Sequence, residues 1–409
     1  MRRIGLILLA ALLVAAVTDA APAQSPKPPP PTPVPPVGSP SPFPSTLETP
    51  APSNRPPRLS APSAALLDLE TGRLLFEQGA GIRRPVASTT KIMTALVVLE
   101  ETDPDEIVSI DGTATRQGGS TLGLRSGERI SVRDLLFALM LQSANDAAVA
   151  LAEHVAGSVG DFVKLINRRA REMGLRDTRF ASPNGLDDSG YSTARDMAAI
   201  TFEAYRNPEF VRIVRTRFRS IPAPRGRPRR IQNRNALLWL YPGAIGVKTG
   251  FTAAAGFSLV AAADRDDLRL ASVVLGGPSD AFSDSAALLD YGFMAFERRV
   301  VLEEGDRFDP SPGGIEVAAV AGATLEALVH RDAELVYQIT PEPRASAGEA
   351  VGTVVVRAAG LTLGEVPLLA VEPAAPAENP RPESSSPPWW RRAVDSMSDS
   401  VVSLLRSIF

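Results

Sequence analysis

Hydrophobic and polar positions follow patterns that change several times along this chain. At its start, Arg2 and Arg3 precede an apolar run over residues 4–17, and Ala21-Pro22-Ala23 follows. A positive start, an apolar run and a small-residue cleavage site are typical of a secretory signal peptide. The run is shorter than the ~20 apolar residues that span a bilayer. Residues 1–23 are therefore interpreted as a signal peptide, with an uncleaved anchor as the alternative, and the rest of the chain is expected to be exported.

Residues 24–58 lack the periodic apolar positions of a folded segment and consist mostly of Pro, Ser and Thr. Proline favours the polyproline II conformation and supplies no backbone donor. We expect a disordered or semi-rigid tether that acts as a spacer.

Patterns of a folded domain begin near Leu59. Two short apolar runs are separated by Glu70-Thr71-Gly72, which predicts a β-hairpin. Apolar residues at helical spacing then predict several helices, and short apolar strands come before a closing helix. The helices are expected at 88–100, 132–141, 146–155, 161–173 and 283–296, and the strands at 64–69, 73–76, 245–249, 257–262 and 270–275. Strands at both ends of a helical region favour one mixed sheet flanked by helices, an α+β domain over residues 59–298.

The pattern changes to short β-rich runs after Arg299, which predicts a small all-β domain over 299–372. A linker rich in Pro, Ala and Ser follows over 373–388. Residues 389–409 place apolar side chains at helical spacing, with charged residues off that stripe and a Trp pair at one end. This pattern is typical of an amphipathic helix in a membrane interface. A helix packed on protein is the alternative.

The composition of the chain excludes several kinds of functional site. The chain has 409 residues, a net charge of -3 and no cysteine. The charge gives no reason to expect nucleic acid as a partner, and a thiol nucleophile, a cysteine zinc site and disulfides are excluded. His154 lies in an apolar helical pattern, where a structural role is expected, and His330 lies far along in a strand-like region. A histidine triad is therefore not expected, and no metal or organic cofactor is implied.

Three motifs, far apart in the chain, carry side chains suited to acyl transfer, and Ser88-Thr89-Thr90-Lys91 is the first. Helical spacing puts Ser88 and Lys91 on one face, so the lysine can reach the serine hydroxyl. A serine is a weak nucleophile until a base takes its proton. A lysine can act as that base when burial and nearby positive charge lower its pKa. Alone, the motif is equally compatible with a helix N-cap followed by a surface lysine.

The other two motifs also have two interpretations each. Ser143-Ala144-Asn145 precedes a predicted helix, where its hydroxyl and amide either face a cleft or cap the helix. Lys248-Thr249-Gly250 ends a predicted strand, where it offers a charge, a hydroxyl and a glycine that permits close approach to the backbone. Its alternative is a strand end with an exposed lysine. All three motifs in this order are far more specific than any one of them.

This ordered set resembles the penicillin-binding serine D-alanyl-D-alanine carboxypeptidases, the low-molecular-mass penicillin-binding proteins of peptidase family S11. The resemblance covers essentially all of the chain after the tether and is carried by residues 85–99, 133–148, 184–197 and 246–256. It implies a β-lactamase/transpeptidase-like domain with a helical subdomain, then a small β domain and a membrane-associated tail. It also implies an enzyme of peptidoglycan biosynthesis at the outer face of the cytoplasmic membrane, with β-lactam antibiotics as covalent inhibitors.

The resemblance further implies a role for each motif residue. Ser88 is expected to be acylated by the penultimate D-Ala carbonyl, expelling the terminal D-alanine before water releases the stem peptide. Lys91 is the expected general base, and Ser143 is expected to assist proton transfer. Backbone N–H groups of Ser88 and Phe251 are expected to form the oxyanion hole.

Substrate binding is expected from the remaining motif residues. Asn145 is expected to hold the substrate, and Lys248, Thr249 and Gly250 to bind its carboxylate side. Arg234 matches a position that helps to bind carboxylate in some relatives, and a surface arginine is the alternative.

The chain departs from the family pattern at two places. Ala144 stands where glycine is frequent, and no second arginine follows Gly276-Gly277.

Three rival functions are the alternatives to a carboxypeptidase. A class A β-lactamase needs a deacylating glutamate, and the nearest match, at Glu172, lacks the accompanying asparagine. An endopeptidase that cuts peptidoglycan cross-links could use the same residues. A catalytically inactive wall-binding protein would have no need to keep Ser88, Lys91 and Lys248 together.

Overall fold

The computed structural model describes Leu47, Thr49 and residues 53–279, 281–310, 315, 317–342 and 349–371. The predicted signal peptide, most of the predicted tether, the linker over 373–388 and the predicted helix over 389–409 lie outside these residues. Within the described ranges, no helix is both long enough and apolar enough to cross a membrane.

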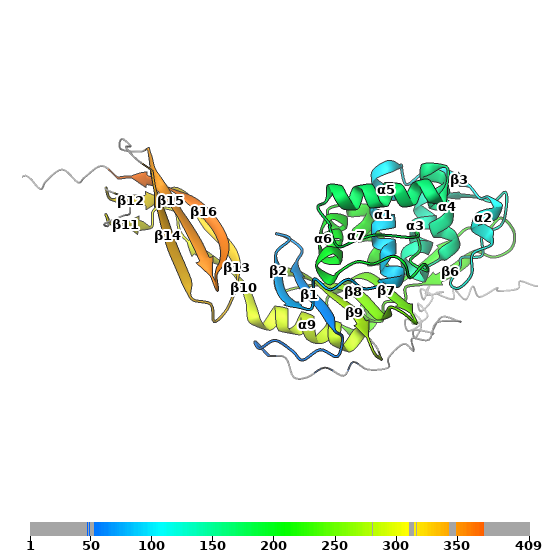
Figure 1. Ribbon diagram of the computed structural model, residues 1–409, viewed down its shortest axis with the longest axis horizontal. Coiled ribbons are helices and arrows are strands. Elements are labelled where there is room, and N and C mark those ends of the chain that lie inside the picture. The colour runs from blue at the N-terminus through cyan, green and yellow to red at the C-terminus, as the bar shows by residue number, and fades with distance from the viewer. Residues whose placement is uncertain are drawn as a thin grey trace, which may run out of the picture. The chain divides into compact units, whose positions relative to one another are not determined.

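The first part of the described chain is built on a five-stranded sheet in the order β2-β1-β9-β8-β7 (Figure 1). The strands are β1 (Ser63–Asp68), β2 (Leu74–Gln78), β7 (Ala244–Thr252), β8 (Gly256–Arg265) and β9 (Leu268–Gly277). The expected α+β fold is confirmed, but the sheet is not mixed, because every pairing in it is antiparallel. Short turns join β1 to β2 and β7 through β9, and such turns reverse the chain direction.

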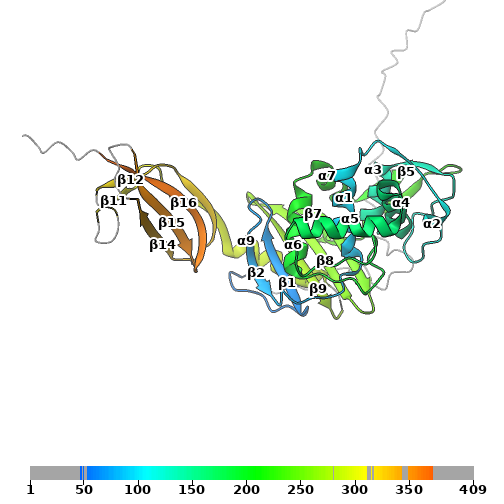
Figure 2. The same ribbon diagram turned by 45° about the horizontal axis from the view of Figure 1, so that its top comes forward.

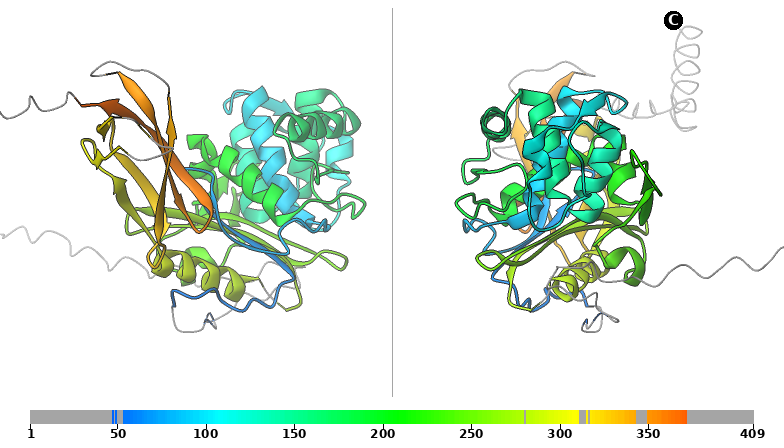
Figure 3. Two further views of the ribbon diagram at one scale, coloured as in Figure 1. Left: turned by 60° about the vertical axis from the view of Figure 1, so that its left-hand side comes forward. Right: turned by 90° about the vertical axis from the view of Figure 1, so that its right-hand side faces the viewer.

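Helices cover both faces of this sheet (Figure 3). Helix α9 (Phe282–Ala295) packs on one face, and the helices between β2 and β7 pack on the other. The buried strand β1 shows the consequence of this arrangement. Its Leu66 belongs to the core beneath α9, whereas the next residue, Leu67, belongs to the core beneath the other helices. Successive strand residues point to opposite faces, so the middle of this strand, residues 64–67, is apolar on both faces.

The helical part contains the predicted helices and several short elements. Ser131, Ser158 and Thr193 accept hydrogen bonds from backbone N–H groups at the starts of three of these helices. The elements are α1 (Lys91–Glu101), α2 (Gly112–Thr115), α3 (Val132–Phe137), α4 (Asn145–Ala156), α5 (Val159–Glu172), α6 (Ala194–Tyr205), α7 (Pro208–Val214) and α8 (Leu237–Leu240), with the hairpins β3 (Ile107–Ser109)–β4 (Arg129–Ser131) and β5 (Phe218–Ile221)–β6 (Arg229–Gln232).

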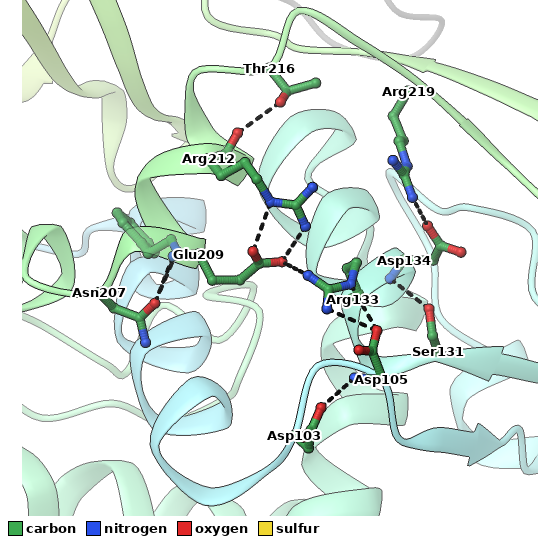
Figure 4. A network of polar contacts seen from close by, with 11 residues as sticks. Asp103, Asp105, Ser131, Arg133, Asp134, Asn207, Glu209, Arg212, Thr216 and Arg219 are labelled. Carbon is green, nitrogen blue, oxygen red and sulfur yellow. Dashed lines mark hydrogen bonds and ion pairs between the residues drawn. The ribbon is translucent and has the colours of Figure 1, made fainter.

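A network of charged side chains ties α7, α3 and the hairpins together (Figure 4). The Arg133 guanidinium donates to Asp105, with Nη2–Oδ1 at 2.8 Å, and also to the Glu209 carboxylate. Arg212, one turn after Glu209, donates to the same carboxylate through Nε at 2.7 Å. Arg219 of β5 pairs with Asp134 at 3.0 Å. The network fixes the first turn of α3, whose continuation leads to the Ser143 motif.

The described residues after α9 form strands and their connections, as expected for the all-β part (Figure 2). Strand β10 (Phe296–Leu302) pairs with β13 (Leu325–His330), and a five-stranded antiparallel sheet has the order β11-β12-β16-β15-β14. Val354, Val356 and Leu368 are at the centre of a separate core. The strands of this sheet are β11 (Arg307–Phe308), β12 (Ala319–Ala321), β14 (Leu335–Pro341), β15 (Ala350–Ala358) and β16 (Leu361–Ala370).

Candidate active site

Ser88 lies on a tight turn directly before α1. Residues Ala87–Thr90 form a single 3-10 turn, and Lys91 is the first residue of the α-helix. Ala87 has a φ of 47°, a left-handed conformation that a side chain disfavours. Ala87 is buried, whereas Ser88 is partly exposed. The strained residue therefore lies immediately before a serine that turns outward from the core.

Two glycines allow other segments to approach this turn. A Cβ atom at Gly185 would stand 1.9 Å from the Ala87 carbonyl oxygen, so only glycine fits there. A Cβ atom at Gly250 would stand 3.1 Å from the Val86 oxygen and 3.2 Å from the Ser88 nitrogen. The glycine of the Lys-Thr-Gly motif thus lets β7 pack against the backbone of the Ser88 turn. Ser88 and Phe251, the residue after Gly250, line the same pocket.

Lys91 is the centre of the buried polar contacts. Its Nζ atom lies 2.9 Å from Ser88 Oγ, 2.9 Å from Asn145 Oδ1 and 2.7 Å from the Asn184 carbonyl oxygen. A protonated lysine has three N–H donors, one for each of these acceptors. A neutral lysine keeps two donors for the Asn145 and Asn184 oxygens. Its lone pair then faces the Ser88 hydroxyl, which donates to it.

The surroundings favour the neutral form of Lys91. Burial lowers its pKa well below the ordinary value, the Arg234 charge lowers it further, and Asp146 acts in the opposite direction. Burial likewise lowers the pKa of Lys248 well below its ordinary value, and the charges of Lys91 and Arg234 add to the effect. Burial lowers the pKa of Arg234 to about 10, so this guanidinium stays cationic at neutral pH.

Neither Ser143 nor Asn145 caps α4, so the capping interpretation of this motif is wrong. A π-helical turn, Ala138–Gln142, ends at Ser143, which has a φ of 62°. The N-cap of α4 is Ala144, which is fully buried and forms no side-chain cap. The Asn145 side chain instead bridges two segments, because its Oδ1 accepts from Lys91 and its Nδ2 donates to the Gly118 oxygen at 2.8 Å.

A pocket with a cavity volume of about 200 Å³ opens above these contacts. Of the residues singled out in the sequence, seven line it: Ser88, Ser143, Asn145, Arg234, Thr249, Gly250 and Phe251. Lys91 and Lys248 lie beneath the lining and are almost fully buried. Lys248 is therefore not an exposed lysine at a strand end. Its Nζ donates to the backbone carbonyl oxygen of Thr249 at 2.9 Å. Arg234 is not a free surface arginine, since its Nη2 donates to Ser120 Oγ at 2.7 Å.

The pocket also contains residues that the motifs did not identify. Ser120 comes from the Gly-rich stretch before β4, and its carbonyl oxygen accepts from the Asn145 N–H at 2.7 Å. Ser258 faces Gly250 across the β7–β8 ladder, and its buried hydroxyl has no hydrogen-bond partner among the described residues. The one feature of the sequence that could have pointed to Ser258 is that it lies in the strand after the Lys-Thr-Gly motif. Leu186 lines the pocket from the loop that carries Gly185.

Other titratable candidates lie away from this pocket. Glu172 ends α5 and is exposed, 3.7 Å from Arg168. His154 lies on α4 with its Nε2 atom 3.1 Å from a Glu106 oxygen, and His330 packs edge-on against Phe296. Within the described ranges, no three His, Asp or Glu side chains come together as metal ligands would.

Comparisons with known proteins identify the family of this chain. The peptidase S11 family model, described as D-alanyl-D-alanine carboxypeptidase, matches residues 50–279. The chain is 33% identical over 353 residues to the D-alanyl-D-alanine carboxypeptidase DacC of Escherichia coli, covering 77% of this chain and 84% of that relative. It is 35% identical to DacF of Bacillus subtilis, covering 58% of this chain and 63% of that relative. The structure of penicillin-binding protein 5 from Haemophilus influenzae aligns with a TM-score of 0.62 at 30% identity, covering 78% of this chain and 98% of that one.

Proposed function

This chain belongs to the peptidase S11 family of D-alanyl-D-alanine carboxypeptidases, and we propose that it removes the terminal D-alanine from peptidoglycan stem pentapeptides through an acyl-enzyme on Ser88. The observation that carries the assignment of residues is the 2.9 Å contact between Lys91 Nζ and Ser88 Oγ. Burial and the Arg234 charge lower the pKa of this lysine, which gives the serine a base.

In the first step, the Ser88 proton passes to neutral Lys91 and Ser88 Oγ attacks the penultimate D-Ala carbonyl carbon. The negative charge that forms on the carbonyl oxygen is stabilised by the N–H groups of Ser88 and Phe251. The C–N bond then breaks, and the amine of D-alanine takes the proton from Lys91 through the Ser143 hydroxyl. The products are free D-alanine and an ester on Ser88.

The terminal carboxylate of the substrate is recognised by a cationic wall of the pocket. Arg234 and Thr249 line this wall, and Lys248 lies beneath it. Burial first, and then the nearby charges of Lys91 and Arg234, lower the pKa of Lys248, and a bound carboxylate would act in the opposite direction by favouring the charged lysine. Peptides without a free C-terminal carboxylate gain none of this stabilisation.

Hydrolysis of the ester completes the cycle. Water gives a proton to Lys91 and attacks the acyl carbonyl, and the Ser88 oxygen leaves and takes that proton. A β-lactam would acylate Ser88 by the same first step. Ser120 and Asn145, which line the same pocket, would hold the peptide amide.

The test follows D-alanine release from a pentapeptide ending in D-Ala-D-Ala by the soluble chain from Leu59 to Val371. We expect release by the wild type and loss of at least about 1,000-fold in Ser88→Ala, because the ester cannot form. Mass spectrometry after exposure to penicillin should place the adduct on Ser88. A folded wild type that releases no D-alanine but cleaves a cross-linked stem dimer would establish the endopeptidase instead.

The location of the enzyme is a further part of this proposal. The pattern of residues 1–23 supports export, and the apolar stripe of residues 389–409 supports binding to the outer face of the cytoplasmic membrane. Such a tail would keep the enzyme beside the peptidoglycan on which it acts.

A further inference from the structure

The stretch that leads from α7 to the Ser88 pocket is strongly basic. From Arg212 to Arg234 the chain has nine arginines and no aspartate or glutamate, although its overall net charge is -3. Most of this stretch is the β5–β6 hairpin and the segments on either side of it. Such a concentration of one charge creates a local field that attracts anions. Which of these arginines can meet an anion depends on their contacts within the protein.

Four of the nine arginines already have partners in the protein, because three pair with carboxylates and one lines the Ser88 pocket. These four are Arg212, Arg219, Arg229 and Arg234. The other five are exposed and form no ion pair among the residues that the structure describes. They are Arg215, Arg217, Arg225, Arg227 and Arg230. Their guanidinium groups keep their N–H donors for a ligand outside the chain.

Strand β6 carries one arginine of each kind. The Arg229 guanidinium donates to the buried Glu128 carboxylate at 2.6 and 2.8 Å, and to the Gly123 oxygen at 3.1 Å. Successive strand residues point to opposite faces, so Arg230 points away from this contact, and it is exposed. Arg229 thus fastens the hairpin to the Gly-rich stretch before β4, while Arg230 and the β5–β6 connection face solvent.

The solvent-facing arginines of the hairpin, Arg225, Arg227 and Arg230, form a basic face close to the Ser88 pocket. Arg230 is four residues from Arg234, which lines the pocket, so their Cα atoms lie about 14 Å apart at most. The Gly-rich stretch to which the hairpin is fastened also supplies Ser120 to the pocket wall. A branched polymer with one branch in the pocket can therefore reach the basic face with another.

We propose that the basic face binds the acidic stem peptides of peptidoglycan that neighbour the stem in the Ser88 pocket. A stem peptide is joined to the sugar through its N-terminal amine, so the carboxylates of the peptide itself stay free. Guanidinium groups pair with carboxylates through two parallel hydrogen bonds. The proposal rests on the proposed function, because it takes the polymer that carries the cleaved stem as the ligand.

The composition of the β5–β6 connection favours an acidic polymer over a lipid surface. Residues 222–228 consist of Pro, Ala, Gly and Arg, with no large apolar side chain. Segments that bind in a membrane interface insert Trp, Phe or Leu side chains there. Three prolines fix φ in this connection and reduce the conformational entropy lost on binding. A stiff, cationic connection without apolar side chains suits a hydrated polymer that carries carboxylates.

The test measures co-sedimentation of the full chain with insoluble peptidoglycan freed of phosphate-containing polymers. Arg225→Gln/Arg227→Gln should weaken binding by about three- to tenfold, the size expected from the loss of two exposed ion pairs. Arg171→Gln/Arg176→Gln is the matched control and should bind as the wild type does. It removes the same charge from exposed arginines outside the basic stretch, which also form no ion pair among the described residues.

Peptidoglycan whose carboxylates have been converted to methylamides is the second probe. With this polymer, the difference between the wild type and Arg225→Gln/Arg227→Gln should disappear, because the carboxylates that pair with the basic face are gone. Unchanged binding of the double variant to native peptidoglycan would overturn the proposal. So would an equal loss in the control, which would mean diffuse attraction, or a loss confined to phosphatidylglycerol vesicles, which would mean that lipid headgroups are the ligand.

Release of D-alanine from a free pentapeptide separates this proposal from the proposed function. Both double variants should keep that activity, since none of the four arginines lines the Ser88 pocket. An active wild type together with unchanged peptidoglycan binding in Arg225→Gln/Arg227→Gln would overturn only the role of the basic face. Binding that changes as expected, without release of D-alanine by the wild type, would overturn only the proposed function.

Discussion

The pKa of Lys91 depends on individual charged side chains near it, and one of them is Arg234. Because the Arg234 charge lowers the pKa of Lys91, Arg234→Gln should raise that pKa. Less of the lysine is then neutral at a given pH, so the acidic limb of kcat/KM for D-alanine release should move to higher pH. Arg230→Gln, an exposed arginine four residues earlier, should leave the limb in place. An unmoved limb in Arg234→Gln would argue against Lys91 as the base.

Asp146 should have the opposite effect on the same lysine. Its charge raises the pKa of Lys91, so Asp146→Asn should move the acidic limb of kcat/KM to lower pH. The carboxylate also accepts N–H groups of Leu122, Gly123 and Leu124 at 2.9–3.1 Å. Loss of part of these bonds should lower the free energy of unfolding by about 1–3 kcal/mol, measured with urea. If the acidic limb of kcat/KM moved in the same direction in Arg234→Gln and Asp146→Asn, these two charges would not control the pKa of Lys91 as described.

Gly185 offers a steric test of how the Ser88 turn is held. Gly185→Ala should lose about 3 kcal/mol or more of stability and most of its acylation by penicillin, because its Cβ would stand 1.9 Å from the Ala87 oxygen. Gly174→Ala is the matched control, since Gly174 has the same φ of +75° and no atom within 4 Å of its Cβ. Gly174→Ala should lower the free energy of unfolding by only about 1 kcal/mol, the cost of a side chain at a left-handed backbone position, and should keep full acylation. Equal losses would show that backbone conformation alone matters.

At the scale of elements, the Arg133 network holds α7 against the start of α3 (Figure 4). Hydrogen bonds from Arg212 are the main cause that lowers the pKa of Glu209. A carboxyl with a lowered folded-state pKa contributes stability above its unfolded pKa, and this contribution is lost as the pH falls through the folded value. Glu209→Gln should therefore be less stable at pH 7 by about 1–3 kcal/mol, and the difference should shrink below about pH 4 in urea unfolding.

Glu172→Gln provides the comparison for this prediction. Glu172 forms an exposed pair with Arg168 at 3.7 Å, so its loss should change stability by less than about 0.5 kcal/mol at any pH. A Glu209 variant that behaves like the Glu172 variant would mean that the network does not stabilise the fold.

At the scale of the whole molecule, the active-site residues and the proposed membrane segment are separate. The pocket is lined by residues between Ser88 and Phe282, and the proposed membrane segment begins at Trp389. A chain that ends at Val371 should therefore release D-alanine as fast as the chain that continues to Phe409, yet should no longer sediment with vesicles containing anionic lipid. Equal sedimentation of both chains would contradict the membrane proposal.

Much of the local structure followed from the sequence, because local structure depends on neighbours in the chain. Two short apolar runs separated by Glu70-Thr71-Gly72 predicted the β1–β2 hairpin, and helical spacing predicted α1, α4 and α5 close to their observed bounds. The spacing of Ser88 and Lys91 also predicted their contact, since three residues make about one helical turn. The 3-10 turn at Ala87–Thr90 was not predicted, because it depends on packing against Gly185 and Gly250.

Only the tertiary structure brought the distant residues together. Lys91 meets Asn145 and Asn184, which lie 54 and 93 residues further along the chain. Ser120 and Ser258 reach the pocket through the Asn145 contact and the β7–β8 register, which no local pattern encodes. The sequence alone predicted the side chains to which we assign the chemistry and most of the helices and strands that carry them. Their distances, their burial and the lowered pKa of Lys91 were decided by the fold, because burial and electrostatic fields depend on the packing of the whole domain.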